Sequence, residues 1–323
     1  MNEYPKIIIC DCDHKNVDVE AGVFAAAGMD FRWLHCQTQE EVIDQCQGAV
    51  CFLNQYVRMD ETIFKAIPTL KFVVRYGVGV DNVNLADATR YGVQVCNVPD
   101  YGMNEVADQA MALLLSVVRK TWLLANRVQA GVWEYAEAIP VRRLSTLTVG
   151  IVGTGRIGSE LAKRLQPFGC KVIAFDTGYL QPSRHFPEGI EYCGSLDELL
   201  SRSDVVSLHC SLNADNQHMM NEKAFARMKD GSYFINVSRG GLVDEAALDA
   251  ALDSGKLAGA GIDVVEKEPL DRTSPLFRHP NLMITPHMAW YSEEAAAELN
   301  RKCAEEAVRF LSGEPVHYPV NTL

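Results

Sequence analysis

Three glycines in the stretch VGIVGTGRIGSELAKRL have the spacing of a loop that holds the phosphates of a dinucleotide. Gly153, Gly155 and Gly158 follow an apolar run that predicts a strand, and they open an amphipathic stretch that predicts a helix. The first glycine permits a tight turn, the second lets the backbone approach a pyrophosphate, and the third lets helix and strand pack closely. The helix N-terminus adds N–H donors for phosphate. A glycine turn without a cofactor is the alternative, but strand, spacing and helix together favour dinucleotide binding.

An aspartate at the end of the next apolar run indicates which dinucleotide is bound. Asp176 is the last residue of KVIAFD, residues 171–176. A carboxylate at that position accepts hydrogen bonds from the two hydroxyl groups of a ribose. The 2′-phosphate of NADP would face a like charge there, so the sequence predicts NAD rather than NADP.

His287, in the stretch TPHMAWYSEE, could transfer a proton because a histidine side chain changes its charge near neutral pH. It follows the apolar run NLMITP, which predicts a strand over 281–286. The chain then enters a predicted helix, with Ser292 as its N-cap and Glu293 and Glu294 favoured by the helix dipole. His287 is therefore expected at the carboxyl end of a strand, where open α/β sheets bind ligands. The alternative is a structural histidine at a strand end.

Short apolar runs alternate with amphipathic stretches along the chain, which is the pattern of parallel sheets covered by helices on both faces. The predicted strands are 6–10, 49–53, 71–75 and 93–98 in the first half, and 148–153, 171–176, 205–210, 232–238, 259–264 and 281–286 in the second. A long helical stretch over 103–130 connects the halves. The expected fold class is α/β, with two Rossmann-like or flavodoxin-like domains on parallel sheets and the active site in the interdomain cleft.

Composition and charge exclude several classes of function. The chain of 323 residues has a formal net charge of −12, and its 30 Lys and Arg residues form no basic run, so nucleic acid is not an expected ligand. No apolar run is long enough for a signal sequence or a membrane span, so a cytoplasmic protein without membrane contact is expected. The ten cysteines include no Cys-x-x-Cys and are expected to be free thiols. CDCDH, residues 10–14, lacks a second ligand pair at zinc-site spacing, so no metal is expected.

Several motifs along the chain resemble those of one enzyme family. GTGRIG, NVSRGGLVDEAAL, GIDVVEKEPL and TPHMAWYSEEA occur in the order typical of the D-isomer-specific 2-hydroxy acid dehydrogenases, and RYGVGVDNV and NVPDYGMNEVADQAM resemble that family's first-domain loop and linker. Within the family the chain looks most like the C-terminal-binding protein branch. LHCSLNADNQHMMN lacks the proline usual in that loop, and AWYSE follows the histidine.

The resemblance implies roles for three catalytic residues. Reduction of a 2-oxo acid needs a hydride at the carbonyl carbon and a proton at the oxygen. His287 would donate that proton. Glu268 would hydrogen-bond the other imidazole nitrogen, and Arg239 would clamp the substrate carboxylate. Glu268 and Arg239 could instead be surface charges.

The resemblance also implies the cofactor and substrate contacts. NAD would contact the glycine loop and other residues, namely Gly153, Gly155, Arg156, Ile157, Gly158, Asp176, His209, Val237 and Asp263. Asp263 would contact the nicotinamide amide, or else cap a turn. The substrate would contact Arg75, Gly77, Val78, Gly79, Arg239 and Trp290. Backbone N–H groups of the turn at 77–79 could hold a carboxylate. Trp290 would form a pocket wall or pack the domain junction.

The family likeness further implies the domains and the assembly. Residues 1–99 and 290–323 would form a substrate-binding (lid) domain, and residues 100–289 the NAD-binding Rossmann domain. A homodimer joined through the NAD-binding domain is expected. The expected function is NAD-dependent interconversion of a 2-oxo acid and a D-2-hydroxy acid, with the particular acid left open. The alternative is an NAD(H)-sensing corepressor-like scaffold of the C-terminal-binding protein type.

Overall fold

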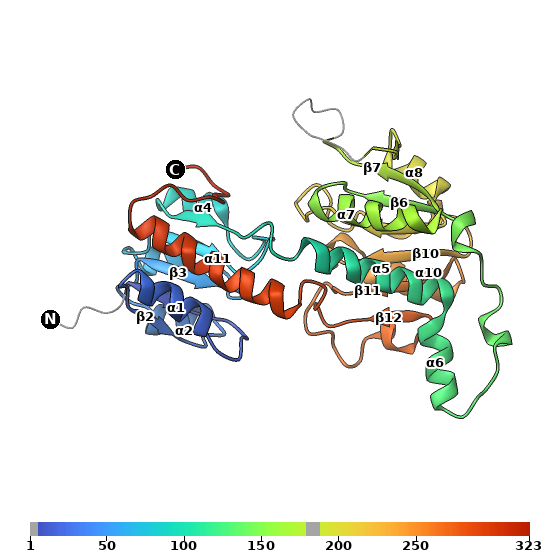
Figure 1. The fold of residues 1–323 in the computed structure, drawn as a ribbon, viewed down its shortest axis with the longest axis horizontal. Helices are drawn as coiled ribbons and strands as arrows, with labels where there is room; N and C mark the ends of the chain where they lie inside the picture. Colours follow the sequence, from blue (N-terminus) through green and yellow to red (C-terminus); the bar gives the residue numbers. More distant parts are fainter. Residues whose placement is uncertain (1–5, 179–187) are drawn as a thin grey trace. The chain divides into compact units, whose positions relative to one another are not determined.

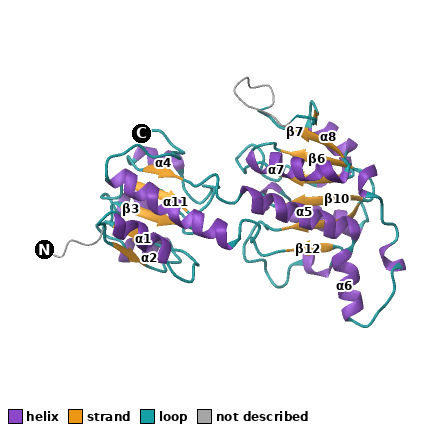
Figure 2. Cartoon of the chain, viewed as in Figure 1, coloured by secondary structure: helices purple, strands orange, loops and turns teal. Residues whose placement is uncertain are grey.

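The computed structural model describes residues 6–178 and 188–323. By its internal contacts the chain divides into two compact units, one of Met1–Gly102 and Ser292–Leu323 and the other of Met103–Tyr291. Each unit contains one sheet with helices around it (Figures 1 and 2). All pairs of strands in both sheets are parallel, as the alternating pattern predicted.

The first unit has a sheet of five strands in the order β2-β1-β3-β4-β5. These strands are β1 (Ile7–Ile9), β2 (Phe31–Trp33), β3 (Cys51–Asn54), β4 (Phe72–Arg75) and β5 (Gln94–Cys96). The helices are α1 (Asp18–Ala26), α2 (Gln39–Gln45), α3 (Glu61–Ala66), α4 (Leu85–Arg90) and α11 (Glu293–Leu311). Central strands such as β1 and β3 are buried along their whole length, because helices cover both faces of a parallel sheet.

The second unit has a sheet of seven strands in the order β12-β11-β10-β9-β6-β7-β8. The strands are β6 (Thr148–Val152), β7 (Lys171–Phe175), β8 (Glu191–Tyr192), β9 (Val205–Leu208), β10 (Ser232–Asn236), β11 (Leu257–Ile262) and β12 (Leu282–Ile284). The helices are α5 (Met103–Arg119), α6 (Thr121–Gln129), α7 (Arg156–Leu165), α8 (Leu196–Arg202), α9 (Glu222–Arg227) and α10 (Glu245–Asp253). Short 3-10 helices lie at Ala136–Ala138, Leu144–Thr146, Gln166–Phe168, Gly240–Leu242 and Pro275–Arg278.

The helical stretch predicted over 103–130 is two helices. Lys120 adopts a left-handed backbone with φ of +55°, and it separates α5 from α6. A left-handed residue commonly ends a helix. α5 buries an apolar face against the sheet, whereas α6 has no buried residue, so packing does not hold the two as one helix.

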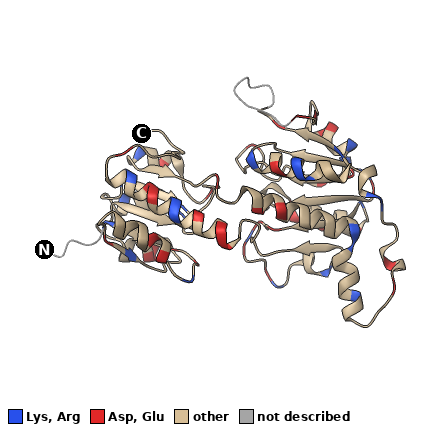
Figure 3. Cartoon of the chain, viewed as in Figure 1, with Lys and Arg blue, Asp and Glu red and all other residues tan. Residues whose placement is uncertain are grey.

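The helices, the thiols and the acidic side chains bear on membrane spans, disulfides and metal sites. No helix among the described residues is long and apolar enough to cross a membrane. The ten cysteines are free thiols. Within the described residues, no group of three or more His, Cys, Asp and Glu side chains could hold a metal ion. Acidic and basic residues are interspersed along α11, where Arg301 and Glu305 form an ion pair of 2.6 Å (Figure 3).

Candidate active site

His287 and Glu268 form a hydrogen-bonded pair in the second unit. His287 Nδ1 lies 2.6 Å from Glu268 Oε2. Both side chains are 37% exposed, so the other ring nitrogen can meet a ligand. The other carboxylate oxygen, Glu268 Oε1, accepts a hydrogen bond of 3.2 Å from the N–H of Val265. The structure thus brings together the two residues predicted to act as an acid and its partner.

The Glu268 carboxylate is held in its charged form. Partial burial raises the pKa of this carboxyl group, whereas the hydrogen bond and positive charge of a protonated His287 lower it. The Val265 N–H and the Arg239 guanidinium act in the same direction, and the net pKa is below the ordinary value. A carboxylate that stays charged favours the protonated imidazole beside it.

Replacing Glu268 with glutamine should displace the pH profile of 2-oxo acid reduction. Reduction requires a protonated His287, and the neutral amide would stabilise the charged ring less than the carboxylate does. The ring would then lose its proton at a lower pH, so the limb on which the rate falls with rising pH should move to lower pH. Initial rates across pH 5 to 9 with saturating NADH check this. Coincident profiles for variant and parent would show that the pair is not used.

Hydrogen bonds to Asp263 hold the turn that carries His287. His287 has φ of +52°, which is unfavourable for a residue with a side chain by roughly 1 to 2 kcal/mol, so neighbouring contacts must maintain it. Its N–H donates to the Asp263 carbonyl at 2.8 Å. The Asp263 carboxylate accepts bonds from Thr285 Oγ1 at 2.5 Å, Met288 N at 3.1 Å and Ala289 N at 2.8 Å.

Asp263 therefore makes the turn-capping contacts that were the alternative to a cofactor contact. Burial raises the pKa of this carboxyl group, against the opposing effect of its three hydrogen bonds. Its predicted contact to the nicotinamide amide stays a prediction. The capping role could not be predicted from the sequence, because Asp263 follows β11 whereas the turn at 285–289 follows β12.

Arg239 lies on the turn that follows β10, at the same edge of the sheet. Its Nη1 donates to the Ser238 carbonyl at 2.8 Å, and its own carbonyl accepts from Asn236 Nδ2 at 3.0 Å. Its guanidinium is near enough to Glu268 to help lower the pKa of that carboxyl group. Arg239, Glu268 and His287 therefore gather at the carboxyl ends of β10, β11 and β12.

The glycine loop has the shape that a pyrophosphate requires. Gly153 has φ of +91°, and a Cβ there would lie 2.9 Å from the backbone nitrogen of Cys210. A Cβ on Gly158 would lie 2.0 Å from the Gly153 carbonyl oxygen, so helix α7 can pack on β6 only with glycine there. A Cβ on Gly155 would meet no atom within 4 Å. The space above Gly155 and the N-terminus of α7 beside it fit the phosphates of NAD.

Asp176 follows β7 and faces this loop. Its Oδ2 accepts from the N–H of Thr154 at 2.8 Å and from Thr154 Oγ1 at 3.2 Å, and its Oδ1 accepts from Gly178 N at 2.8 Å. This carboxylate is also the group expected to accept hydrogen bonds from the ribose diol of NAD. Thr154 was not singled out from the sequence, because it is one of the variable positions of the glycine motif.

Replacing Asp176 with serine should narrow the preference for NADH over NADPH by about tenfold or more. Two negative charges about 4 Å apart repel by roughly 1 to 4 kcal/mol, and the variant removes one of them. The ratio of kcat/KM for the two cofactors checks this. Asp176→Asn is the control, since it removes the charge and keeps an acceptor for Thr154. An unchanged ratio in both variants would show that the 2′-position of the cofactor ribose does not lie beside Asp176.

The other predicted cofactor residues lie at the start of α7 or after β9 and β10. Arg156 is exposed and Ile157 half-buried at the start of α7, and Val237 is buried after β10. His209 follows β9, with Nε2 2.8 Å from Ser207 Oγ. Burial lowers the pKa of His209 to about 3, so this ring is neutral at physiological pH. Its Nδ1 is buried and has no hydrogen-bond partner in the described structure.

The predicted carboxylate-binding turn lies in the first unit, after β4. Gly77 has φ of +128°, and its carbonyl accepts from Val98 N at 3.0 Å. The Val78 carbonyl accepts from Asn97 Nδ2 at 2.6 Å. Both carbonyls are thus bonded to residues 97 and 98, and the backbone–backbone hydrogen bonds of the described residues include none from the N–H groups of Val78 and Gly79. These N–H groups suit an anion.

The surroundings of this turn include residues that the sequence did not reveal. The Tyr76 hydroxyl donates to the fully buried Glu20 carboxylate at 2.8 Å. Arg75 lies against the turn, since a Cβ on Gly77 would be 1.8 Å from Arg75 Nη1.

In the second unit, Trp290 is half-buried and its ring meets Tyr291 edge to face at 5.4 Å. The substrate roles of Arg75 and Trp290 stay predictions.

The second unit is thus a dinucleotide-binding Rossmann fold with a histidine and a carboxylate at its ligand-binding edge. Residues 111–289 match the family described as D-isomer specific 2-hydroxyacid dehydrogenase, NAD binding domain. The chain is 35% identical over 285 residues to a glycerate dehydrogenase of Methylorubrum extorquens, covering 86% of this chain and 88% of the relative. It is 36% identical over 278 residues to a glyoxylate reductase of Korarchaeum cryptofilum, covering 85% and 82%.

A solved structure gives the same result for the fold. D-lactate dehydrogenase of Aquifex aeolicus, in complex with NAD and lactic acid, superposes with a TM-score of 0.86 at 28% identity, over 95% of this chain and 96% of that one. The chain belongs to the D-isomer-specific 2-hydroxyacid dehydrogenase family. It is an NAD-dependent oxidoreductase that interconverts 2-oxo acids and D-2-hydroxy acids. The predicted fold class, enzyme class and cofactor are confirmed.

Proposed function

We propose that this enzyme reduces a short 2-oxo acid, of the size of glyoxylate or hydroxypyruvate, to the corresponding D-2-hydroxy acid. The observation that carries the chemistry is the 2.6 Å pair of His287 and Glu268 beside Arg239. The substrate class is supported by relatives named as glycerate dehydrogenase and glyoxylate reductase. Nothing in these relatives supports the C-terminal-binding protein branch, so the corepressor scaffold is not proposed.

Each residue in the proposal has a distinct task. The glycine loop and Asp176 would hold NAD, and the bound cofactor would supply or accept the hydride. Arg239 binds the substrate carboxylate and polarises the carbonyl with its planar fork. His287 gives its proton to the carbonyl oxygen during reduction and takes it back during oxidation. Glu268 fixes the imidazole tautomer and stabilises the charged ring.

We further propose that Met1–Gly102 with Ser292–Leu323 is the substrate-binding unit and Met103–Tyr291 the NAD-binding unit. The N–H groups of Val78 and Gly79, at the turn after β4, support a carboxylate-binding role for the first unit. The ten free thiols suit a reducing compartment such as the cytoplasm.

A panel of 2-oxo acids with NADH tests the substrate class. Initial rates for glyoxylate, hydroxypyruvate, phosphohydroxypyruvate, pyruvate and a branched longer acid are read from the loss of nicotinamide absorbance. We expect the highest kcat/KM for glyoxylate or hydroxypyruvate. A clear preference for the branched or phosphorylated acid would overturn the proposed size class and leave the reaction type intact.

A homodimer joined through the NAD-binding unit is part of the proposal. Helix α6 has no buried residue, and the segment after it exposes Trp133 at 89%, Tyr135 at 75% and Ile139 at 62%. An exposed apolar surface of this kind marks an interaction site. The ion pair of Arg127 and Glu137, with two contacts of 2.7 Å, holds this segment on α6.

Light scattering after size exclusion should therefore give twice the chain mass of 35.8 kDa at micromolar concentration. Trp133→Asp combined with Ile139→Asp should shift the protein toward the monomer, because the charges would have to be buried without partners. Phe277→Asp, at another exposed aromatic residue, is the control and should leave the mass unchanged. A monomeric parent would refute the dimer.

A further inference from the structure

Residues outside the catalytic set form a hydrogen bond and an ion pair with the loop that carries Glu268. The N–H of Glu266 donates to Glu245 Oε1 at 2.7 Å. The Glu266 side chain forms an ion pair of 2.7 Å with His218 Nε2. Within the loop, Val265 N donates to Glu268 Oε1. The peptide groups on either side of Val265 are therefore bonded to two different glutamates.

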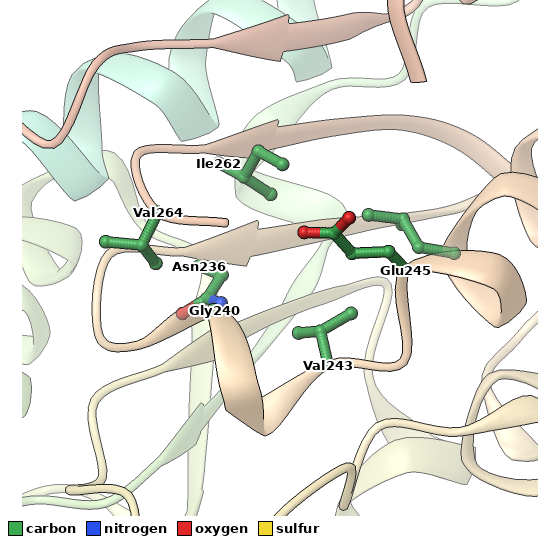
Figure 4. A pocket seen from close by; sticks show the side chains of 7 residues that line it. Asn236, Gly240, Val243, Glu245, Ile262 and Val264 are labelled. Atoms are coloured by element: carbon green, nitrogen blue, oxygen red, sulfur yellow. The ribbon is translucent and has the colours of Figure 1, made fainter. Parts of the chain in front are cut away.

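Glu245 is the first residue of α10, and its carboxylate points into a small pocket (Figure 4). The pocket is lined by Asn236 and by the apolar side chains of Val243, Leu248, Ile262 and Val264. A glutamate in the first turn of a helix is commonly explained by the helix dipole. Here, however, the carboxylate bonds the Glu266 N–H and not an N–H of its own helix.

The same loop is in direct contact with the turn that carries Arg239. A Cβ on Gly240 would lie 1.9 Å from the carbonyl carbon of Val265 and 2.3 Å from the nitrogen of Glu266. The two backbones can approach this closely only because residue 240 is glycine. A shift of the loop would therefore change the position of Glu268 relative to both His287 and Arg239.

We propose that Glu245 is a positioning residue for the acid partner. By holding the Glu266 N–H it fixes the 264–268 loop, and the loop in turn aims the Glu268 carboxylate at His287 Nδ1. Glu245 touches neither the reacting atoms nor the imidazole, so its effect passes through Glu268. This inference rests on the proposed use of the His287 and Glu268 pair in catalysis.

Glu245→Ala tests the inference, with Glu245→Gln and Glu222→Ala as matched variants. Glutamine keeps an oxygen that can accept from the Glu266 N–H. Glu222 is the first residue of α9 and is exposed, so Glu222→Ala removes a comparable helix-dipole interaction without touching the loop. Amide hydrogen exchange of residues 264–268, kcat and the pH profile of reduction are measured for all three variants and the parent.

We expect Glu245→Ala to exchange these amides faster and to lose about 10-fold to 10²-fold in kcat, because small displacements of a catalytic group are costly. Its pH profile should move to lower pH, in the direction expected for Glu268→Gln, with KM for NADH unchanged. Glu245→Gln should restore most of kcat and of the amide protection. Glu245→Asp, which keeps the charge and shortens the reach, replaces the alanine variant if that variant does not fold.

Unchanged exchange of residues 264–268 in Glu245→Ala would overturn the inference. So would a kcat and a pH profile in Glu245→Ala that equal those of Glu222→Ala. Failure of the proposed function would look different: the loop would loosen in Glu245→Ala as expected, while His287→Ala and Glu268→Gln behaved like the parent.

Discussion

Replacing His287 with alanine should lower kcat for 2-oxo acid reduction by about 10²-fold to 10⁴-fold, the range typical of a general acid. The proton that His287 gives to the carbonyl oxygen would have to come from water. Binding of NADH should be unchanged, because the glycine loop and Asp176 lie on other strands of the same sheet. Steady-state kinetics and a fluorescence titration of NADH measure the two effects separately.

His317→Ala is a suitable control for the histidine variant. His317 is also near a glutamate, with Nδ1 3.4 Å from Glu306 Oε1, but it lies in the first unit near the end of the chain. Its loss should leave kcat within about twofold. If His287→Ala turned over at the parent's rate, another group would have to supply the proton.

Replacing Arg239 with glutamine should reduce kcat/KM for the 2-oxo acid by on the order of 10²-fold to 10³-fold. Removing one partner of a buried charged hydrogen bond costs roughly 2 to 5 kcal/mol, and about 1.4 kcal/mol corresponds to a tenfold change. Arg239→Lys should recover only part of the loss, because an ammonium group lacks the planar fork that matches a carboxylate.

A substrate that lacks the carboxylate makes this test specific for the proposed role of Arg239. Glycolaldehyde has no carboxylate, so Arg239→Gln should penalise glyoxylate much more than glycolaldehyde. Arg202→Gln is the control, because Arg202 forms an ion pair of 2.6 Å with Glu198 within its own helix. An equal loss of kcat/KM for glyoxylate and glycolaldehyde would assign Arg239 a structural role.

The parts of the site that could be predicted from the sequence are those whose signal is local. Gly153, Gly155 and Gly158 are defined by spacing alone, and Asp176 by its place after the next strand. His287 could be assigned to a strand end for the same reason. The α/β architecture followed from the alternation of short apolar runs with amphipathic stretches.

The parts that could not be predicted depend on contacts between distant segments. Lys120 interrupts the helical stretch although no glycine or proline marks the break, and the helix that follows it, α6, has no buried residue. Asp263 caps a turn more than 20 residues away, at an interval that follows no pattern in the sequence. Glu245 meets the Glu268 loop across a separation of 21 residues. Such contacts become visible only when the strand ends are placed side by side.

The most direct test of the central claim is oxidation of paired enantiomers. D-glycerate, L-glycerate, D-lactate and L-lactate are each supplied with NAD⁺, and formation of NADH is followed at the nicotinamide absorbance. The arrangement of Arg239, His287 and the glycine loop, together with membership of the family, predicts turnover of D enantiomers alone, with D-glycerate the better substrate. Equal turnover of the L enantiomers, or no turnover of any 2-hydroxy acid, would contradict the account.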